Sequence, residues 1–128
     1  MSIRYRFESG TVVLHLDGEY SKEDLARLIL ASLDDPSCPV RPDILFDFSF
    51  SEGIHHRSTQ DVLEMARFLI GLKGRLGARV AFCAPEDLSF GFMRMGTVGI
   101  EDIGVRTEVF RTIEEAWAWL RSQHGLGV

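Results

Sequence analysis

The chain has 128 residues, which is enough for one ordinary domain and too few for two of full size. It contains 14 Lys and Arg against 19 Asp and Glu, so its formal net charge is −5 at pH 7. This balance argues against a general nucleic-acid binder, which needs concentrated positive charge to meet phosphates. Apolar residues make up 45% and charged residues 26%, which is typical of a globular protein with a core.

The first residues and the hydropathy of the chain predict its cellular location. Arg4 and Arg6 stand where a secretory signal would have its apolar region, so no export is expected. No apolar run approaches the ~20 residues that a membrane-spanning helix needs. We therefore expect a cytoplasmic protein without an integral membrane segment, in which Cys38 and Cys83 are reduced thiols.

The first third of the chain predicts a hairpin followed by a helix. Residues 2–8 alternate apolar and polar side chains, residues 12–16 alternate again, and a Gly-containing turn joins the two runs. Ser21 is the expected N-cap of an amphipathic helix over 22–33, with acidic residues in its first turn. The three prolines that follow mark a loop.

The middle of the chain predicts two buried strands with a helix between them. Residues 44–48 are apolar except for Asp47, which is typical of a central strand covered on both faces in a parallel sheet. A long amphipathic helix is expected from Ser58 to about Arg75, and a second buried strand over 78–83.

The last third predicts a helix, a strand and a final helix. Pro85 opens a helix that runs to about Val98, and residues 105–110 form the last strand. Thr112 and Glu115 have the spacing of a capping box at the start of the final helix.

The predicted order of elements is β-β-α-β-α-β-α-β-α, which indicates a single α/β domain over residues 1–122 with a C-terminal tail at 123–128. Its sheet should be mixed and five-stranded, with a starting antiparallel hairpin, then parallel strands, and about four helices on its faces. Residues 44–48 should lie inside the sheet, and residues 2–8 antiparallel to their neighbour.

Five segments of the chain follow one another in a pattern that points to one family. They are residues 44–49, the helix opening at Ser58, residues 78–81, residues 91–95, and residues 109–110 with 115–120. Together they resemble the SpoIIAA-like family, which is grouped with STAS (sulfate-transporter and anti-sigma-antagonist) domains and resembles a minimal lipid-binding CRAL-TRIO module. The resemblance covers nearly the whole chain. It implies a small bacterial cytoplasmic protein with a regulatory or ligand-binding role and no established enzyme chemistry.

Asp47, Ser49, Ser58 and Thr59 are the candidate crevice residues, expected to converge at one end of the sheet. Asp47 is the only acid in the most apolar strand, and the carboxyl ends of parallel strands border the usual functional crevice. Its carboxylate either relays a phosphate or orients a ligand, or it caps the loop over 49–57 by accepting backbone N–H groups.

Ser58 and Thr59 stand where the resemblance implies the phosphorylated serine of an anti-sigma antagonist. A phosphate at a helix N-terminus is electrostatically favoured. The antagonist pattern resembles Asp-Ser-Ser-Gly, whereas this chain has Arg57 before the serine and Gln60 after Thr59, so the acid and the glycine are both missing. The alternative is a plain helix cap at Ser58, with Asp61 three residues on.

Metal binding and hydrolysis are both disfavoured by the residue pattern. Adjacent His55 and His56 point apart and have no CxxC or HExxH partner, so no metal site is expected. Asp47, one of these histidines and Ser58 contain the letters of a hydrolase triad, but no G-x-S-x-G elbow accompanies them. We predict a protein that is not an enzyme and has no cofactor.

The helix expected over 86–98 carries large apolar side chains on two faces. One face, which includes Phe92, has enough apolar groups to pack on the sheet. Phe90 and Met93 fall on the opposite side, where a surface helix is normally polar. They indicate a partner surface or the lip of an apolar pocket, with Trp119 at its rim, and burial within the chain is the alternative.

These features favour a non-enzymatic regulatory or protein-interaction domain of SpoIIAA-like (STAS) type. It would bind a protein partner, form a homodimer through an apolar helix surface, and be switched by phosphorylation. The alternative is a protein that binds or carries a small, lipid-like apolar ligand.

Overall fold

Strands and helices alternate along the chain after an initial hairpin, and the computed structural model describes residues 2–51, 59–77, 79–84 and 105–125. The strands in these ranges are β1 (Ser2–Glu8), β2 (Thr11–Asp17), β3 (Asp43–Asp47), β4 (Arg79–Cys83) and β5 (Arg106–Phe110). The helices are α1 (Lys22–Asp34), α2 (Thr59–Gly71), the short 3₁₀ helix η2 (Lys73–Arg75) and α4 (Ile113–Gly125).

All five strands form one mixed sheet in the order β1-β2-β3-β4-β5. β1 pairs antiparallel with β2, and every later neighbour is parallel. β3 therefore lies inside the sheet, while β1 and β5 are its edges. The predicted hairpin, the parallel remainder and the interior position of residues 44–48 are confirmed.

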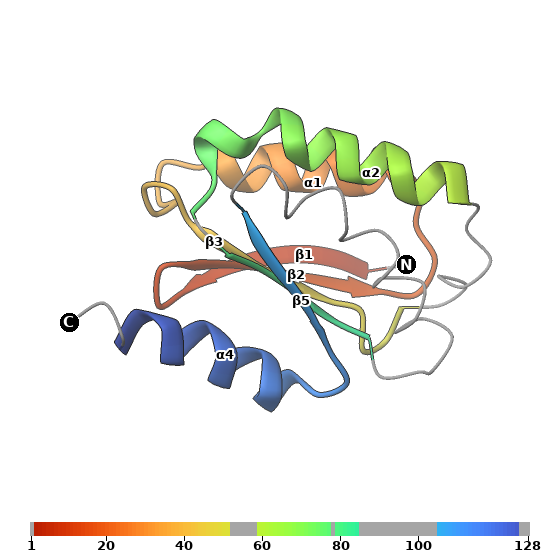
Figure 1. Cartoon of the computed structure of the whole chain (residues 1–128). Coiled ribbons are helices and arrows are strands. Elements are labelled where there is room, and N and C mark those ends of the chain that lie inside the picture. The colour runs from red at the N-terminus through yellow and green to blue at the C-terminus, as the bar shows by residue number, and fades with distance from the viewer. Residues whose placement is uncertain (1, 52–58, 78, 85–104, 126–128) are drawn as a thin grey trace.

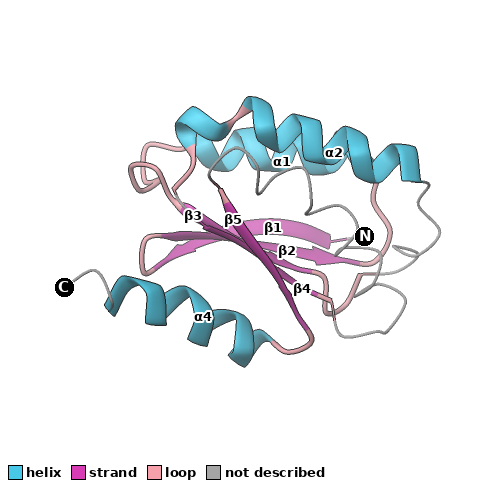
Figure 2. Cartoon of the chain, in the orientation of Figure 1, coloured by secondary structure: helices cyan, strands magenta, loops and turns pink. Residues whose placement is uncertain are grey.

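The helices lie on both faces of the sheet. α1 and α2 run side by side over one face, and α4 crosses the other (Figures 1 and 2). The described residues thus contain three α-helices, against about four expected. The helix predicted over 86–98 lies outside the described residues.

Each face of the sheet has its own apolar cluster, which explains why the central strands are apolar almost throughout. On the α1–α2 side, Phe46 and Phe82 stack with ring centroids 4.9 Å apart. On the α4 side, strand residues pack against the inner face of the helix. The buried members of this second cluster are Val13, Leu45, Ala81, Ala116, Trp117 and Leu120.

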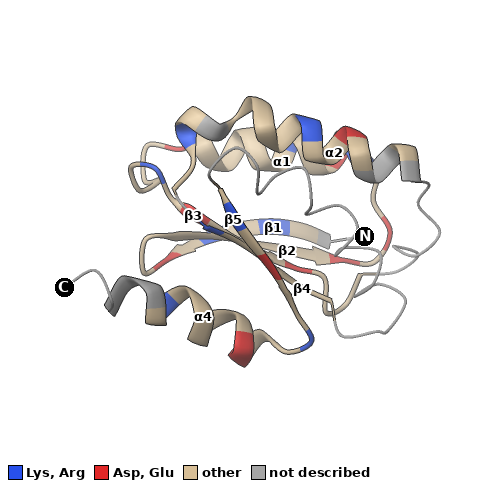
Figure 3. Cartoon of the chain, in the orientation of Figure 1, with Lys and Arg blue, Asp and Glu red and all other residues tan. Residues whose placement is uncertain are grey.

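Capping residues fix the starts of α1 and α4. Asp24 N–H donates to the Ser21 hydroxyl at 3.0 Å and the Asp24 carboxylate accepts from Ser21 N–H at 3.2 Å, so the predicted N-cap is confirmed. Glu115 N–H donates to the Thr112 hydroxyl at 3.2 Å. Acidic residues occupy the first turn of α4 and a basic residue lies nearer its end, which suits the helix dipole (Figure 3).

The helix expected to continue to Arg75 ends earlier than predicted. α2 ends at Gly71, and the chain then tightens into η2, where Arg75 N–H donates to Leu72 O at 2.8 Å. Glycines at 71 and 74 lower the helical propensity of this stretch, which explains the early end. At the other end of the chain, α4 continues to Gly125, within the segment expected as a tail.

Candidate functional site

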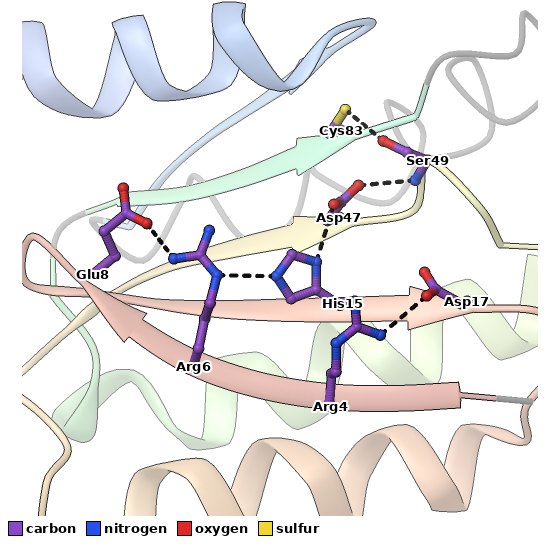
Figure 4. A network of polar contacts seen from close by, with 8 residues as sticks. All are labelled: Arg4, Arg6, Glu8, His15, Asp17, Asp47, Ser49 and Cys83. Atoms are coloured by element: carbon purple, nitrogen blue, oxygen red, sulfur yellow. Dashed lines mark hydrogen bonds and ion pairs between the residues drawn. The ribbon is translucent and has the colours of Figure 1, made fainter.

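A row of polar side chains crosses the sheet near the carboxyl ends of its parallel strands (Figure 4). Strand register places Arg4 beside His15, His15 beside Asp47, and Asp47 beside Cys83. We call these four residues the polar row. His15, Asp47 and Cys83 each lie two positions beyond a member of the apolar cluster under α4, so the row is on the α4 side of the sheet.

Asp47 is the centre of the polar row and uses both carboxylate oxygens. Its Oδ1 accepts a hydrogen bond from Ser49 N–H at 3.0 Å, and its Oδ2 lies 3.2 Å from His15 Nδ1. Only 13% of the Asp47 side chain is exposed. The expectation that Asp47 caps the start of the following loop is therefore confirmed at Ser49, and the contact with His15 adds a second role.

His15 is a member of the site that was not predicted from the sequence, and neither were Arg6 and Phe50. Nε2 of His15 lies 3.2 Å from Nε of Arg6, and the His15 ring is 19% exposed (Figure 4). The signal available was a lone histidine in an otherwise apolar strand, on the same face as the even-numbered charges of β1. It could be used only once the register of β2 against β3 was known.

Ser49 contacts two members of the polar row, Asp47 and Cys83. The Ser49 hydroxyl and the Cys83 sulfur are 3.6 Å apart. Burial raises the pKa of the Cys83 thiol above its ordinary value of 9.0, and the Asp47 carboxylate raises it further, against a lowering by the Ser49 hydroxyl. Cys83 is thus held as a neutral thiol, which is the less nucleophilic form.

Ion pairs surround the polar row on β1 and β2. Arg4 pairs with Asp17 at 3.1 Å, and Arg6 pairs with Glu8. Glu8 also accepts from Arg121 of α4 at 3.2 Å. The hydrogen bond from Arg6 lowers the pKa of Glu8 below its ordinary value, and the Arg6 and Arg121 charges lower it further, so Glu8 is a carboxylate between two cations.

The segment after β3 presents an exposed aromatic side chain, that of Phe50. Gly18 N–H donates to Phe50 O at 2.8 Å, Ser51 N–H donates to Phe48 O at 3.1 Å, and the Tyr20 hydroxyl lies 2.8 Å from that of Ser51. These bonds fix the backbone at Phe50, while its side chain is 73% exposed.

The structure brings together some of the predicted site residues. Asp47 and Ser49 meet at the carboxyl edge, and Thr59 begins α2 at the same end of the sheet (Figure 1). Ser58 lies outside the described residues, as do Phe90, Phe92 and Met93. Trp119 is half-buried in the α4-side cluster, where its ring centroid lies 5.7 Å from that of Phe110.

The chemistry open to this site is set by how its polar atoms are already used. The imidazole of His15 and the carboxylate of Asp47 are hydrogen-bonded to each other and to Arg6 and Ser49. Among the residues that the structure describes, no three His, Cys, Asp or Glu side chains form a group that could hold a metal ion.

Comparison with known proteins gives no family for the chain. No model of a known protein family matches it, and a search of curated proteins finds no match. Within the described ranges, no helix combines the length and the apolar character needed to cross a membrane.

Proposed function

We propose that the chain is a non-enzymatic protein-interaction domain of SpoIIAA-like (STAS) type. It binds its partner at the end of the sheet where the parallel strands have their carboxyl ends. The observation that carries this proposal is Phe50, an aromatic side chain left in water on a backbone fixed by hydrogen bonds. Leaving a side chain of this size exposed forgoes ~1.5–3 kcal/mol of burial free energy. A partner that covers Phe50 recovers this free energy.

The fixed backbone makes Phe50 a suitable anchor for binding. Ordering a segment on association has an entropic cost that lowers affinity, and here residues 50 and 51 are already held by their bonds to Gly18 and Tyr20. Interface energy is concentrated in a few anchors, many of them large and aromatic, surrounded by polar contacts. Ser49 and Ser51, which flank Phe50 in the sequence, supply polar groups of that kind.

The state of the polar row supports binding rather than catalysis. Nucleophilic catalysis needs a side chain that is activated by a lowered pKa or by a base within hydrogen-bond distance. Here the pKa of the Cys83 thiol is raised, and His15 Nε2 already accepts from Arg6.

A second copy of the chain is the partner that we propose. In a two-fold dimer the same patch faces itself, so each Phe50 is covered by the other subunit. Phosphorylation of Ser58, the residue before α2, is the proposed switch, because it would add negative charge at the end of the sheet where α2 begins.

Sedimentation equilibrium tests this dimer. Phe50→Asp should convert a wild-type dimer into a folded monomer, because it places a charge in the centre of the interface. Val40→Asp is the matched control, since Val40 is 93% exposed but lies in the loop that leads into β3, at the opposite end of this strand from Phe50. That control should remain dimeric. A wild-type monomer at all concentrations, or a dimer that survives Phe50→Asp, would contradict the proposal.

Native mass spectrometry of the same samples separates this function from the alternative. A dimer with no added mass supports an interaction domain. A monomer that carries a co-purified apolar molecule supports the ligand carrier expected from Phe90, Phe92 and Met93.

A further inference from the structure

We propose that His15 is a proton-operated latch that holds the edge strand β1 against the centre of the sheet. The histidine lies between Arg6 of β1 and Asp47 of β3 and contacts both, so one ring links three strands (Figure 4). This device needs no partner, and it is therefore independent of the interaction function proposed above.

The first step of the argument is the position of the ring proton. Nε of an arginine can only donate a hydrogen bond, so His15 Nε2 must be the acceptor in the 3.2 Å contact with Arg6. The single proton of the neutral imidazole is then on Nδ1, from which it is donated to Asp47 Oδ2. The closed latch therefore fixes one tautomer of a neutral histidine.

The second step is what a second proton does. Protonation at Nε2 turns the acceptor into a donor, which faces the N–H of Arg6 and brings two cations together. The Arg6 contact must then break. The Nδ1–H contact with Asp47 persists and becomes an ion pair, so His15 stays in place and Arg6 is the group that moves.

The surrounding charges allow Arg6 to leave. Arg6 already pairs with Glu8, which can keep the guanidinium at the surface. Arg4 of β1 lies beside His15 and is paired with Asp17 of β2 at 3.1 Å, and Arg121 of α4 pairs with the same Glu8 at 3.2 Å. Beyond Asp47 the next group is Cys83, a neutral thiol. The latch thus opens between β1 and β2 while the contact between β2 and β3 remains.

The test is NMR spectroscopy of the ring and guanidinium nitrogens of the full chain as the pH is lowered. Neutral His15 should carry its proton on Nδ1. The Arg6 Nε–H signal should shift and exchange faster with the same midpoint as the His15 titration. The Arg75 Nε–H signal is the control, because Arg75 also pairs with an exposed carboxylate, that of Asp34 at 2.7 Å, but belongs to η2 and not to a strand beside His15, and it should not follow His15.

Variants complete the test. His15→Leu removes the acceptor, so the Arg6 signal should lose its response at that midpoint. Should this variant fail to fold, Arg6→Met removes the donor instead, and the Nε2 shift should move to that of an unbonded ring nitrogen. A proton on Nε2 of neutral His15, or an Arg6 signal that does not follow the His15 titration, would overturn the latch.

Discussion

Gly77 lies so close to the loop before β3 that an added methyl group has no room. Its N–H donates to Pro42 O at 2.7 Å, and a Cβ at this position would lie 2.6 Å from Arg41 O and 2.7 Å from Asp43 Oδ1. This close approach aligns the starts of β3 and β4, where Asp43 also accepts from Arg79 N–H.

We expect Gly77→Ala to lower the free energy of unfolding by about 1–3 kcal/mol, which is typical of overpacking. Urea denaturation measures this change. Gly71→Ala is the control, because nothing lies within 4 Å of a Cβ at the end of α2. The control should be neutral or stabilising by about 0.4–1 kcal/mol, through reduced entropy of the unfolded chain. Equal effects of the two substitutions would contradict the close-packing argument.

Tyr5 links the edge strand to the end of α1 through a hydrogen bond that depends on pH. Its hydroxyl donates to Asp35 Oδ2 at 2.7 Å. This bond raises the pKa of Tyr5 above its ordinary value of 10.0, and it lowers the pKa of Asp35 below its ordinary value of 3.8. The hydrogen bond therefore stabilises the folded state at pH values above the pKa of Asp35 and below the pKa of Tyr5. It is lost as pH rises through the raised pKa of Tyr5 and as pH falls through the lowered pKa of Asp35.

Tyr5→Phe should thus lower the urea midpoint at neutral pH, with a difference from wild type that shrinks at both extremes. Stability curves of the two proteins across the pH range measure this difference. A difference that stays constant with pH would show that the hydroxyl acts through packing alone.

The sequence predicted individual side-chain roles best where the partner is close along the chain. Ser21 and Asp24 lie three residues apart, and their capping box follows from helix geometry. His15 and Asp47 are far apart in sequence, and they meet only because β2 and β3 pair in one particular register. A shift of one residue would turn His15 to the opposite face, so no local pattern could identify this pair.

At the scale of elements, hydropathy patterns located all five strands, and the ends of helices were harder to place. The early end of α2 depends on how η2 turns toward β4, and the Gly77 contact with Pro42 fixes that turn. This tertiary contact acts together with the low helical propensity of Gly71 and Gly74, and the two outweigh the apolar periodicity that favoured a longer helix. The two faces of the sheet could be inferred as covered, whereas their assignment to α1, α2 and α4 required the structure.

The start of α2 gives a prediction about regulation. α2 begins at Thr59, so a negative group at Ser58 would stand before the helix N-terminus. If phosphorylation controls the proposed dimer, Ser58→Glu should change the dimer dissociation constant measured by sedimentation, while Ser58→Ala should leave it near the wild-type value.

Direct labelling provides the second measurement for Ser58. Incubation with ATP and a cognate kinase should add one phosphate to the wild type and none to Ser58→Ala. Label that persists in this variant would assign the modification to another residue. If Ser58 is only a helix cap, Ser58→Ala should instead lower the free energy of unfolding by about 1 kcal/mol and leave association unchanged.

At the scale of the whole molecule, α4 is tied to the far edge of the sheet. Arg121 reaches Glu8 at the end of β1, and its guanidinium carbon also lies 4.8 Å from the centre of the Trp117 ring. The last helix thus contacts the first strand, although its apolar face packs mainly over the centre of the sheet. The two ends of the described chain therefore support each other.

The strand order also bears on how the chain reaches its native state. Every strand pairs with the strand next to it in sequence, so each new strand adds to an edge that already exists. The β1–β2 hairpin closes a short loop and can form quickly, whereas each parallel pairing closes a connection of roughly 20 to 30 residues and forms more slowly. During synthesis, β1, β2 and β3 can assemble with α1 before β4 leaves the ribosome, because none of them needs a later strand between them. The exposed edge of β3 then exists only until β4 arrives, which shortens the time during which an unpaired apolar strand could aggregate.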